Sequence, residues 1–539
     1  MRPATDRTPQ REVSQSAPVF EPKTQRCRAC VLTQTIQDTM ISPSKNTARA
    51  AGIALLTLGA ALLCGQHNLS ADSRISKEEQ AAMAELKSDL DKILAVKRMK
   101  DVKASIHVRD LDTGQTVYEK DPDRQLNPAS NAKIITAAAV LDRFGPSHTF
   151  KTEIWSDRKD REGTVEGDIV LTGNGDPFLK WNHLLELAER TRRKGVKTVA
   201  GDLVVDDTAF DDRFMPPAFD QKNEEAPYRT TVGAVSAEFS AMTVIVAPRK
   251  AGQKPSVRFE PPGDYAIVEN SAVSVDSAKE AKSKPLAIRL AKGRGRTRVI
   301  ITGNTHKGAT VRKRVDFPTI YAGHLMKEAF RVVGIKVKGA VRRGKRPEGH
   351  RLMARHHSYT MTYNILAMQK WSNNFMAEML YKSLDLNKNG PATWSGAQSR
   401  VEKFLGKAGL KPGSYKFTNG SGLYDANRLS ARQFTTLLAY MHTRRDILPD
   451  FETSFAIAGV DGTLGRRMKD TGAHRVLRGK TGTLNRVVTL TGTVQTKSGR
   501  KLGFSILFNN AKGGAWGFRQ IQDKIGARLA RYGTNRAQN

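Results

Sequence analysis

The spacing of apolar residues divides the chain into helical and strand-like regions. Apolar residues at helical spacing predict a helix over residues 76–96. Residues 104–120 alternate between apolar and polar side chains on both sides of an Asp-Thr-Gly turn, which predicts a β-hairpin. Residues 127–144 then predict a second helix, whose start is marked by an Asn-Pro pair. Its expected buried stripe consists of Ile134, Ile135, Ala138, Leu141 and Phe144.

From about residue 151 the pattern changes to short strand-like runs that are interrupted by glycine, aspartate and proline. Within this part, helical periodicity is confined to residues 181–194 and 321–333. Helical periodicity dominates again over 359–440. The chain closes with two strands and an amphipathic helix, at 487–496, 501–510 and 515–533. Helices and strands at both ends therefore indicate one α/β domain that is interrupted by a β-rich insertion.

The composition is globular and strongly basic. Among 539 residues, 88 Lys and Arg face 53 Asp and Glu, which gives a formal net charge of +35. Such a charge favours an anionic partner, such as nucleic acid, an acidic membrane surface or a carboxylate-rich polymer. Residues 289–315 and 336–351 are the most basic stretches. Because few aromatic residues are interleaved for stacking, we expect a solvated basic surface there rather than a dedicated polyanion site.

The three cysteines all lie near the N-terminus, at Cys27, Cys30 and Cys64, so the rest of the chain cannot form an internal disulfide framework. Residues 45–65 combine a basic flank with a short apolar core, which predicts an export signal. Met40 is then a candidate start that leaves a signal of normal length. We expect a cleaved signal and a periplasmic protein, with a lipid anchor at Cys64 as the alternative.

The first candidate for chemistry is a serine with a lysine three residues later, Ser130 and Lys133. Residues at this spacing share one helix face, so the amine can lie against the hydroxyl and take its proton. Burial lowers the pKa of a lysine and makes it a base. Only this pair opens an apolar helix; the other matches to the pattern lie before the signal, in a charged loop and at a hairpin tip. They are Ser42/Lys45, Ser156/Lys159 and Ser498/Lys501.

Two further patterns occur later in the chain. Ser372-Asn373-Asn374 lies between two helical stretches, where it can act as a helix N-cap or can supply a second hydroxyl and a substrate-binding amide. Lys480-Thr481-Gly482-Thr483 lies on the strand before the last hairpin. A strand edge can pair with an extended peptide, a glycine lets that peptide approach closely, and the lysine and hydroxyls can bind a terminal carboxylate.

Taken together and in this order, S-x-x-K, S-x-N and K-T-G resemble the motifs of penicillin-binding proteins and serine β-lactamases. Ser372 lies 242 positions after Ser130, a separation that exceeds what a β-lactamase accommodates. The chain is thus similar to the penicillin-binding protein 4 type of D-alanyl-D-alanine carboxypeptidase/endopeptidase, the low-molecular-mass class C. LTGNGDPFL, GDLVVDDTAF and NGSGLYDANRLSARQF look like that family as well, and the resemblance covers residues 76–533.

This resemblance implies an α/β fold of the serine β-lactamase/transpeptidase type, in which an antiparallel sheet is flanked by helices and nested β-rich domains are inserted. We expect a leader and signal segment, a transpeptidase-like domain in two parts, an insertion domain II in two parts, and a small basic β domain III. In chain order, the expected boundaries are 1–71 (leader), 72–155 (transpeptidase), 156–248 (II), 249–317 (III), 318–355 (II) and 356–539 (transpeptidase).

The resemblance also implies roles for individual residues. Ser130 is the expected nucleophile, Lys133 its base, and Ser372 the third catalytic residue. The expected substrate-binding residues are Asn374, Lys480, Thr481, Gly482, Thr483 and Asp206. Family members hold the diaminopimelate amine of the stem peptide with an acidic residue of the first insertion, and Asp206, with Asp207 beside it, is the best match. The backbone N–H groups of Ser130 and Thr483 are expected to form the oxyanion hole.

The expected activity is therefore hydrolysis of D-Ala-D-Ala and of cross-linked stem peptides in peptidoglycan, with β-lactams as covalent inhibitors. We expect no metal or cofactor and no nucleic-acid partner, while peripheral contact with a membrane stays open. Two alternatives remain: a serine β-lactamase, against which the long insertion argues, and a basic wall-binding protein with an inert cleft. Replacing Ser130 by Ala separates these classes, because a pure binding role survives that change.

Overall fold

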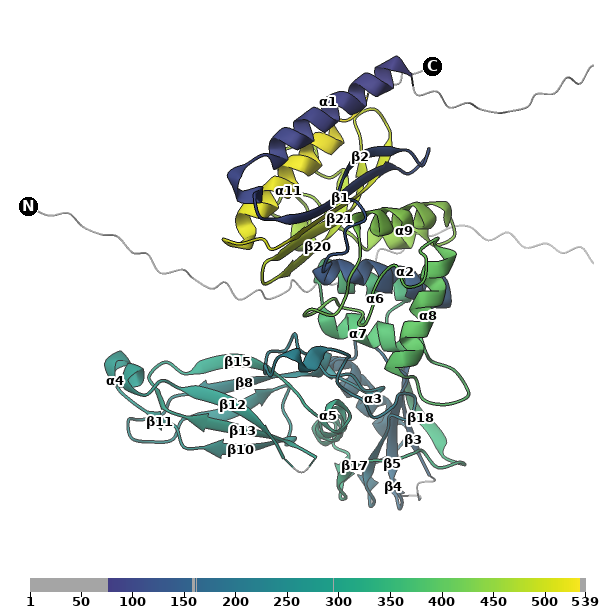
Figure 1. The fold of residues 1–539 in the computed structure, drawn as a ribbon. Coiled ribbons are helices and arrows are strands. Elements are labelled where there is room, and N and C mark those ends of the chain that lie inside the picture. Colours follow the sequence, from purple (N-terminus) through teal and green to yellow (C-terminus); the bar gives the residue numbers. More distant parts are fainter. Residues whose placement is uncertain (1–75, 158–159, 161, 294, 534–539) are drawn as a thin grey trace, which may run out of the picture. The chain divides into compact units, whose positions relative to one another are not determined.

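Strands from both ends of the chain pair in one antiparallel sheet (Figure 1). The computed structural model describes residues 76–157, 160, 162–293 and 295–533. Within them, β1 (Lys103–Asp110) pairs with β22 (Lys501–Asn509), so the two ends are joined directly. The other strands of this sheet are β2 (Thr116–Lys120), β19 (Ala456–Ile457), β20 (Leu477–Leu484) and β21 (Val487–Gln495). The order β19-β20-β21-β22-β1-β2 contains the expected hairpin and both expected C-terminal strands.

Both faces of this sheet are covered by helices because β22 is apolar on both sides. Phe504, Ile506 and Phe508 belong to one buried cluster, together with α1 (Lys77–Leu94) and α11 (Ala515–Ala530). These two helices, the first and the last of the described chain, lie side by side in Figure 1. Leu507, which points the other way along the strand, belongs to a second cluster that includes α9 (Ala431–Thr443).

The second cluster is centred on α2 (Ala132–Phe144), the helix that follows Ser130. Every residue of α2 from Ala132 to Leu141 is buried, which includes the predicted stripe except Phe144, a half-buried residue. The helix is enclosed because other helices pack around it. They are α6 (Met361–Lys370), α7 (Asn374–Ser383), α8 (Trp394–Lys407) and α10 (Leu448–Thr453). The burial of this helix on all sides is thus explained by its central position.

The insertion begins and ends on neighbouring strands. β3 (Lys151–Ser156) pairs antiparallel with β18 (Arg351–His357) in a five-stranded sheet of order β17-β7-β5-β3-β18. The other elements here are β5 (Ile169–Gly173), β7 (Leu203–Asp206), β17 (Val341–Arg343), α3 (Trp181–Arg193) and α5 (Pro318–Val332). The proposed boundaries at 155/156 and 355/356 fall inside β3 and β18. Alternation along a strand does not reveal the sheet to which it belongs, so the sequence placed both boundaries within a strand.

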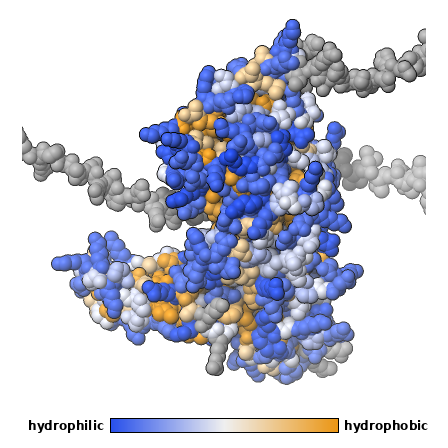
Figure 2. Space-filling model, in the orientation of Figure 1, coloured by the Kyte–Doolittle hydropathy of each residue, from blue (hydrophilic) through white to orange (hydrophobic). Residues whose placement is uncertain are grey.

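A smaller β module is nested inside this insertion. One sheet has the order β15-β8-β9, and a second has the order β10-β13-β12. Their strands are β8 (Ala241–Ala247), β9 (Ser256–Glu260), β10 (Ala266–Asn270), β12 (Ala287–Lys292), β13 (Thr297–Thr302) and β15 (Ala309–Arg314). β8 therefore pairs with the module, although the sequence assigned it to the preceding segment. Figure 2 shows mainly hydrophilic residues on the visible face, with apolar residues gathered over this module.

Several shorter elements complete the described chain. Two-residue strands pair parallel in the order β16-β6-β4, and β11 pairs with β14. These strands are β4 (Thr164–Val165), β6 (Thr198–Val199), β11 (Val273–Ser274), β14 (Asn304–Thr305) and β16 (Lys336–Val337), and the remaining helix is α4 (Ala278–Ser283). In the part of the chain that the structure describes, no helix is both long and apolar enough to cross a membrane. The predicted signal and the three cysteines lie outside that part.

A buried ion pair joins the insertion to the helices around α2. Lys382 of α7 is fully buried, and its Nζ donates to Asp211 Oδ1 at 2.5 Å and to the Arg213 carbonyl at 3.1 Å. The aromatic rings of Phe210 and Trp394 lie within 5.3 Å and 4.7 Å of the same Nζ. Burial lowers the pKa of Lys382, while Asp211 opposes that shift. The pair therefore fixes the loop after β7 against α7.

Replacing Lys382 by Met should destabilise the protein, because Asp211, whose side chain is only 21% exposed, would lose the ammonium group that pairs with it. Removing one member of a buried pair costs roughly 3 kcal/mol. Lys407→Met is the matched control, since Lys407 pairs with Asp142 at the surface with its side chain 54% exposed, and such pairs contribute about 1 kcal/mol or less. Thermal unfolding of both variants checks this expectation; equal losses would contradict a structural role for the Lys382 pair.

Candidate active site

Ser130 lies at the junction between a loop and α2. It occupies the middle of a 3-10 turn, Ala129–Asn131, that leads directly into the helix. Ala129 has φ +47°, a strained conformation for a residue with a side chain. The Asn127 Oδ1 accepts a hydrogen bond from the Ala129 backbone N–H at 2.9 Å, and the Asn127 N–H donates to Asn509 Oδ1 at the end of β22. The sheet thus holds the strained turn that presents Ser130.

Lys133 is fully buried one turn further along, and its Nζ has three hydrogen-bond partners. It donates to Ser130 Oγ at 3.1 Å, to Asn374 Oδ1 at 2.8 Å and to the Ser421 carbonyl at 2.8 Å. Burial lowers the pKa of Lys133 to about 7, an effect that the nearby Glu378 carboxylate opposes. A substantial fraction of this amine is therefore neutral at physiological pH.

The Ser-Asn-Asn motif supplies both a helix cap and two site residues. Asn373 is the N-cap of α7, and its side chain accepts from the Met376 N–H at 3.0 Å. Ser372 has φ +55°, and its Oγ accepts from Lys480 Nζ at 2.9 Å. Asn374 contacts Lys133 through its oxygen and donates through Nδ2 to the Tyr228 carbonyl at 3.0 Å. The N-cap interpretation is therefore confirmed for Asn373, while Ser372 and Asn374 each contact one of the two buried lysines.

The Lys-Thr-Gly-Thr motif lies on β20, as predicted. Lys480 is fully buried, and its Nζ also donates to the Thr481 carbonyl at 2.8 Å. Burial and then the charge of Lys133 lower the pKa of Lys480 well below its ordinary value. β19 pairs only with Gly479 and Arg478, so in the described chain no strand covers the edge of β20 from Lys480 onwards. That edge is available to an extended peptide.

Gly482 is required by the protein itself. A Cβ at this position would lie 2.2 Å from Thr489 Oγ1 and 2.9 Å from the Pro128 carbonyl. The absence of a side chain at this position thus allows β20 to pack closely against the loop before Ser130. The glycine is needed for this contact within the protein as well as for the approach of a substrate. Thr481 Oγ1 donates to Thr463 Oγ1 at 2.8 Å, and Thr483 Oγ1 accepts from Arg519 at 3.2 Å.

A buried carboxylate supports this arrangement from behind. Glu378 of α7 is fully buried, and its two oxygens accept from the backbone N–H groups of Ser421 at 2.8 Å and Gly420 at 3.2 Å. These residues belong to the Asn-Gly-Ser-Gly turn whose carbonyl binds Lys133. Burial raises the pKa of Glu378. The sequence analysis missed Glu378, although a single acid within the apolar run FMAEML is a detectable signal.

Two pockets flank Ser130, and both include Ser372 and Thr483. The first measures about 590 Å³ and is lined by residues of the insertion and of the turn after Ser421, among them Glu224, Tyr228, Tyr424 and Asp425. The second measures about 650 Å³ and lies beside the start of α11. The motif residues therefore meet at the centre of a long cleft, although they come from distant parts of the sequence.

Asp206 lies elsewhere. It ends β7, where Oδ1 accepts from the Thr208 N–H at 3.1 Å and Oδ2 accepts from the Arg346 N–H at 2.8 Å. Asp206 lines a separate pocket with Trp155 and Arg346 and neither of the pockets that contain Ser130. Asp207 is buried against Thr319 and Arg343. The structure therefore does not bring either aspartate to the other predicted site residues.

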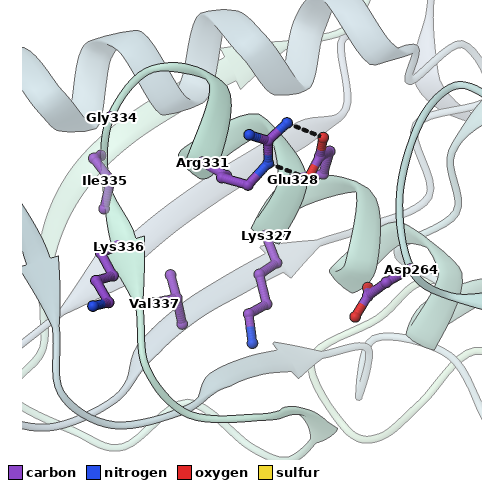
Figure 3. A pocket seen from close by; sticks show the side chains of 8 residues that line it. All are labelled: Asp264, Lys327, Glu328, Arg331, Gly334, Ile335, Lys336 and Val337. Atoms are coloured by element: carbon purple, nitrogen blue, oxygen red, sulfur yellow. Dashed lines mark hydrogen bonds and ion pairs between the residues drawn. The ribbon is translucent and has the colours of Figure 1, made fainter.

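A further pocket, of about 510 Å³, lies within the insertion and has no residue in common with the cleft (Figure 3). Apart from Lys336, its charged groups already have partners. Arg331 donates to both oxygens of Glu328, at 2.7 and 2.8 Å, as the dashed lines in Figure 3 show, and Lys327 donates to the Gly339 carbonyl. Asp264 accepts from His324. No serine, threonine or cysteine of the described chain lines this pocket, and it is not part of the candidate active site.

Known proteins with the same organisation support this description. The chain matches the model of the D-Ala-D-Ala carboxypeptidase 3 (S13) family over residues 86–532. A D-alanyl-D-alanine carboxypeptidase of Actinomadura sp. (strain R39) is 33% identical over 494 residues, which cover 87% of this chain and 89% of the relative. The D-alanyl-D-alanine carboxypeptidase DacB of Haemophilus influenzae is 24% identical over 416 residues, covering 74% of this chain and 84% of the relative.

A solved structure confirms the fold. The crystal structure of penicillin binding protein 4 from Haemophilus influenzae matches with a TM-score of 0.71 at 22% identity, covering 83% of this chain and 99% of that one. The transpeptidase-like fold that the motifs implied is therefore confirmed. Because the family model spans most of the sequence and a relative with one third identity covers nearly all of it, this chain belongs to the D-Ala-D-Ala carboxypeptidase 3 (S13) family of serine peptidases.

Proposed function

We propose that this protein is an exported serine DD-peptidase that acts on peptidoglycan stem peptides. As a carboxypeptidase it releases the terminal D-Ala, and as an endopeptidase it cleaves the bond that cross-links two stem peptides. The observation that carries the proposal is the contact of 3.1 Å between Ser130 Oγ and the fully buried Lys133 Nζ, in a chain that belongs to the S13 family.

The contacts of Lys133 support its role as the base for Ser130. Once Lys133 is neutral, its Nζ keeps two N–H groups and one lone pair. The Asn374 oxygen and the Ser421 carbonyl can only accept, so they take the two N–H groups. The lone pair is then directed at Ser130, whose O–H donates its proton as Oγ bonds to the carbonyl carbon of D-Ala. The backbone N–H groups of Ser130 and Thr483 are the proposed oxyanion hole.

Ser372 and Lys480 are the proposed route for the proton to the leaving amine. Lys480 Nζ donates to Ser372 Oγ, and Ser372 lines both pockets beside Ser130. As the C–N bond breaks, the Ser372 hydroxyl can pass its proton to the amine and accept another from Lys480. The acyl group then remains on Ser130 until water attacks it. Along β20, Thr481 and Thr483 are the proposed ligands of the substrate carboxylate.

The acidic residue that binds the amine of the stem peptide is better assigned to Glu224 than to Asp206. Glu224 belongs to the insertion and lines the pocket that contains Ser130. Its carboxylate accepts from the hydroxyls of Tyr228 at 2.5 Å and Tyr424 at 3.2 Å, and these bonds lower its pKa. The group is therefore ionised at neutral pH and can pair with an ammonium group.

Export, the cell wall and β-lactams complete the proposal. The predicted signal directs the enzyme to the periplasm, and the net charge of +35 suits a polymer rich in carboxylates or peripheral contact with an anionic membrane. The Haemophilus influenzae protein has been crystallised with a β-lactam, and its fold is the same. We propose that β-lactams acylate Ser130. The insertion argues against the β-lactamase alternative, and the buried base beside Ser130 argues against an inert cleft.

Incubation with benzylpenicillin should leave one persistent adduct on the protein, because Ser130 is proposed to attack the β-lactam carbonyl carbon and to form a covalent ester. Intact-mass measurement reports the adduct, and Ser130→Ala should show none. Rapid drug hydrolysis without an adduct would favour the β-lactamase alternative. Intact drug and an unmodified protein would favour a binding protein.

The rate of acylation should increase as the pH rises through about 7, since only neutral Lys133 can accept the proton and its pKa is about 7. The second-order rate constant for a β-lactam, measured between pH 5 and 9, checks this expectation. Thermal unfolding at each pH serves as the control for loss of structure. A rate that is independent of pH over this range would contradict the role of Lys133 as the base.

Glu378→Gln should move the midpoint of that pH profile to lower pH, because the carboxylate opposes the loss of a proton from Lys133. A variant that merely loosened the turn at Ser421 would lower the rate at every pH without moving the midpoint. Glu402→Gln, on the exposed side of α8, removes an equal charge and should leave the midpoint in place. An unchanged midpoint in Glu378→Gln would show that this carboxyl is uncharged in the folded protein.

A further inference from the structure

The second pocket beside Ser130 is built by α11 and by the turn after β19. It shares Ser130, Ser372 and Thr483 with the first pocket and no other lining residue, so the two extend in different directions from the same serine. The residues that belong to it alone are Thr463, Arg466, Arg467, Thr481, Trp516, Arg519, Gln520 and Asp523. A group that occupies this pocket therefore lies next to the reacting bond and away from the insertion.

The charge of the cleft reverses across Ser130. Glu224 and Asp425 line the first pocket with a single cation, Lys222, which lies 3.7 Å from Glu224, and Asp425 also pairs with Arg428 at 2.7 Å. Three arginines line the second pocket, with Asp523 as its one acid, and Asp523 already pairs with Arg467 at 2.7 Å. Arg466 and Arg519 are exposed and have no ion pair within the described residues. The first pocket thus suits an ammonium group, and the second suits carboxylates.

An aromatic ring stands at the edge of the arginine pocket. Trp516 is 71% exposed. This is unusual for a large apolar side chain, which is normally stabilised by burial. It lies three residues before Arg519 in α11, so both side chains share one face of the helix. Tryptophan and arginine are often found together where proteins bind peptides. The indole ring supplies contact area, and the guanidinium group orients an anionic group of the ligand.

We propose that the pocket formed by Arg466, Trp516 and Arg519 binds the second stem peptide, the leaving strand of a cross-linked substrate. This inference rests on the proposed DD-peptidase function. In both reactions Ser130 Oγ bonds to the carbonyl carbon, the C–N bond breaks, and the amine leaves with a proton. In the carboxypeptidase reaction the leaving group is a single D-Ala, which is small enough to be bound by Lys480 and the threonines of β20 alone. In the other it is a whole stem peptide with further carboxylates, which requires additional space and additional cations.

The pocket should therefore contribute to cleavage of cross-linked peptides and not to release of D-Ala. Trp516→Ala combined with Arg466→Gln removes an exposed ring and an exposed charge, and neither residue contacts a motif residue in the hydrogen bonds of the structure. Arg445→Gln is the matched control, because this exposed arginine lies in the turn before α10 and lines no pocket beside Ser130.

Three rates are measured for each protein: cleavage of a cross-linked muropeptide dimer, D-Ala release from a monomeric pentapeptide, and acylation by benzylpenicillin. The double variant should cleave the dimer roughly tenfold more slowly in kcat/KM, with the other two rates unchanged. Arg445→Gln should match the parent protein in all three. Equal losses with both peptides, or no loss with either, would overturn the proposal, as would a parent protein that releases D-Ala and does not cleave the dimer.

Binding without turnover separates this inference from the function on which it rests. In a Ser130→Ala background, the double variant should bind the dimer roughly tenfold more weakly, while its Kd for the monomer stays the same. If the parent protein is not acylated and yet this difference in Kd appears, the proposed chemistry fails and the pocket assignment stands. If the parent protein is acylated and the two Kd values for the dimer agree, the pocket assignment fails alone.

Discussion

The burial of two lysine amines in one cleft is the constraint on which the rest of the site depends. Lys133 and Lys480 are both fully buried, and the charge of each disfavours the charge of the other. Such an arrangement is stable only where every N–H group has an acceptor and where at least one amine can lose its proton. The strained conformations at Ala129 and Ser372, the turn at Ser421 and the buried Glu378 can all be understood as the means by which the fold meets these two conditions.

This constraint also explains the distribution of the site over the chain. Acceptors for one buried amine cannot all come from its own helix, because the backbone carbonyls there are already used by helical hydrogen bonds. Lys133 accordingly takes its acceptors from the start of α2, from α7 and from the turn after α8. A change in the packing of any of these elements would therefore shift Lys133 and alter its contact with Ser130. The ion pair of Lys382 with Asp211 matters for the same reason, because it fixes α7 against the insertion.

The sequence revealed those parts of the site that are short and local. Ser130/Lys133, the Ser-Asn-Asn motif and Lys-Thr-Gly each lie within one turn or one strand, and the structure brings them together where the hydrophobic pattern placed them. Glu378 was missed because its partners, Gly420 and Ser421, are distant in sequence. The proposed roles of Glu224 and Trp516 depend on pockets that only the folded chain forms. Asp206 was chosen by similarity of its surrounding residues, and the structure places it in another pocket. Two of the expected domain boundaries fall inside β3 and β18 for a related reason, since only pairing shows to which sheet a strand belongs.

The position of β22 has a consequence for how the protein is made. The hairpin of β1 and β2 is synthesised early, but its neighbour in the sheet, β22, begins at Lys501. Until that strand emerges, the edge of β1 is unpaired and the apolar faces around it are uncovered, a state that is prone to aggregation. The insertion contains its own sheets and can form first, while the peptidase sheet cannot close before β22 is available to pair with β1. Assembly of the active site thereby depends on a contact between strands that are about 400 residues apart.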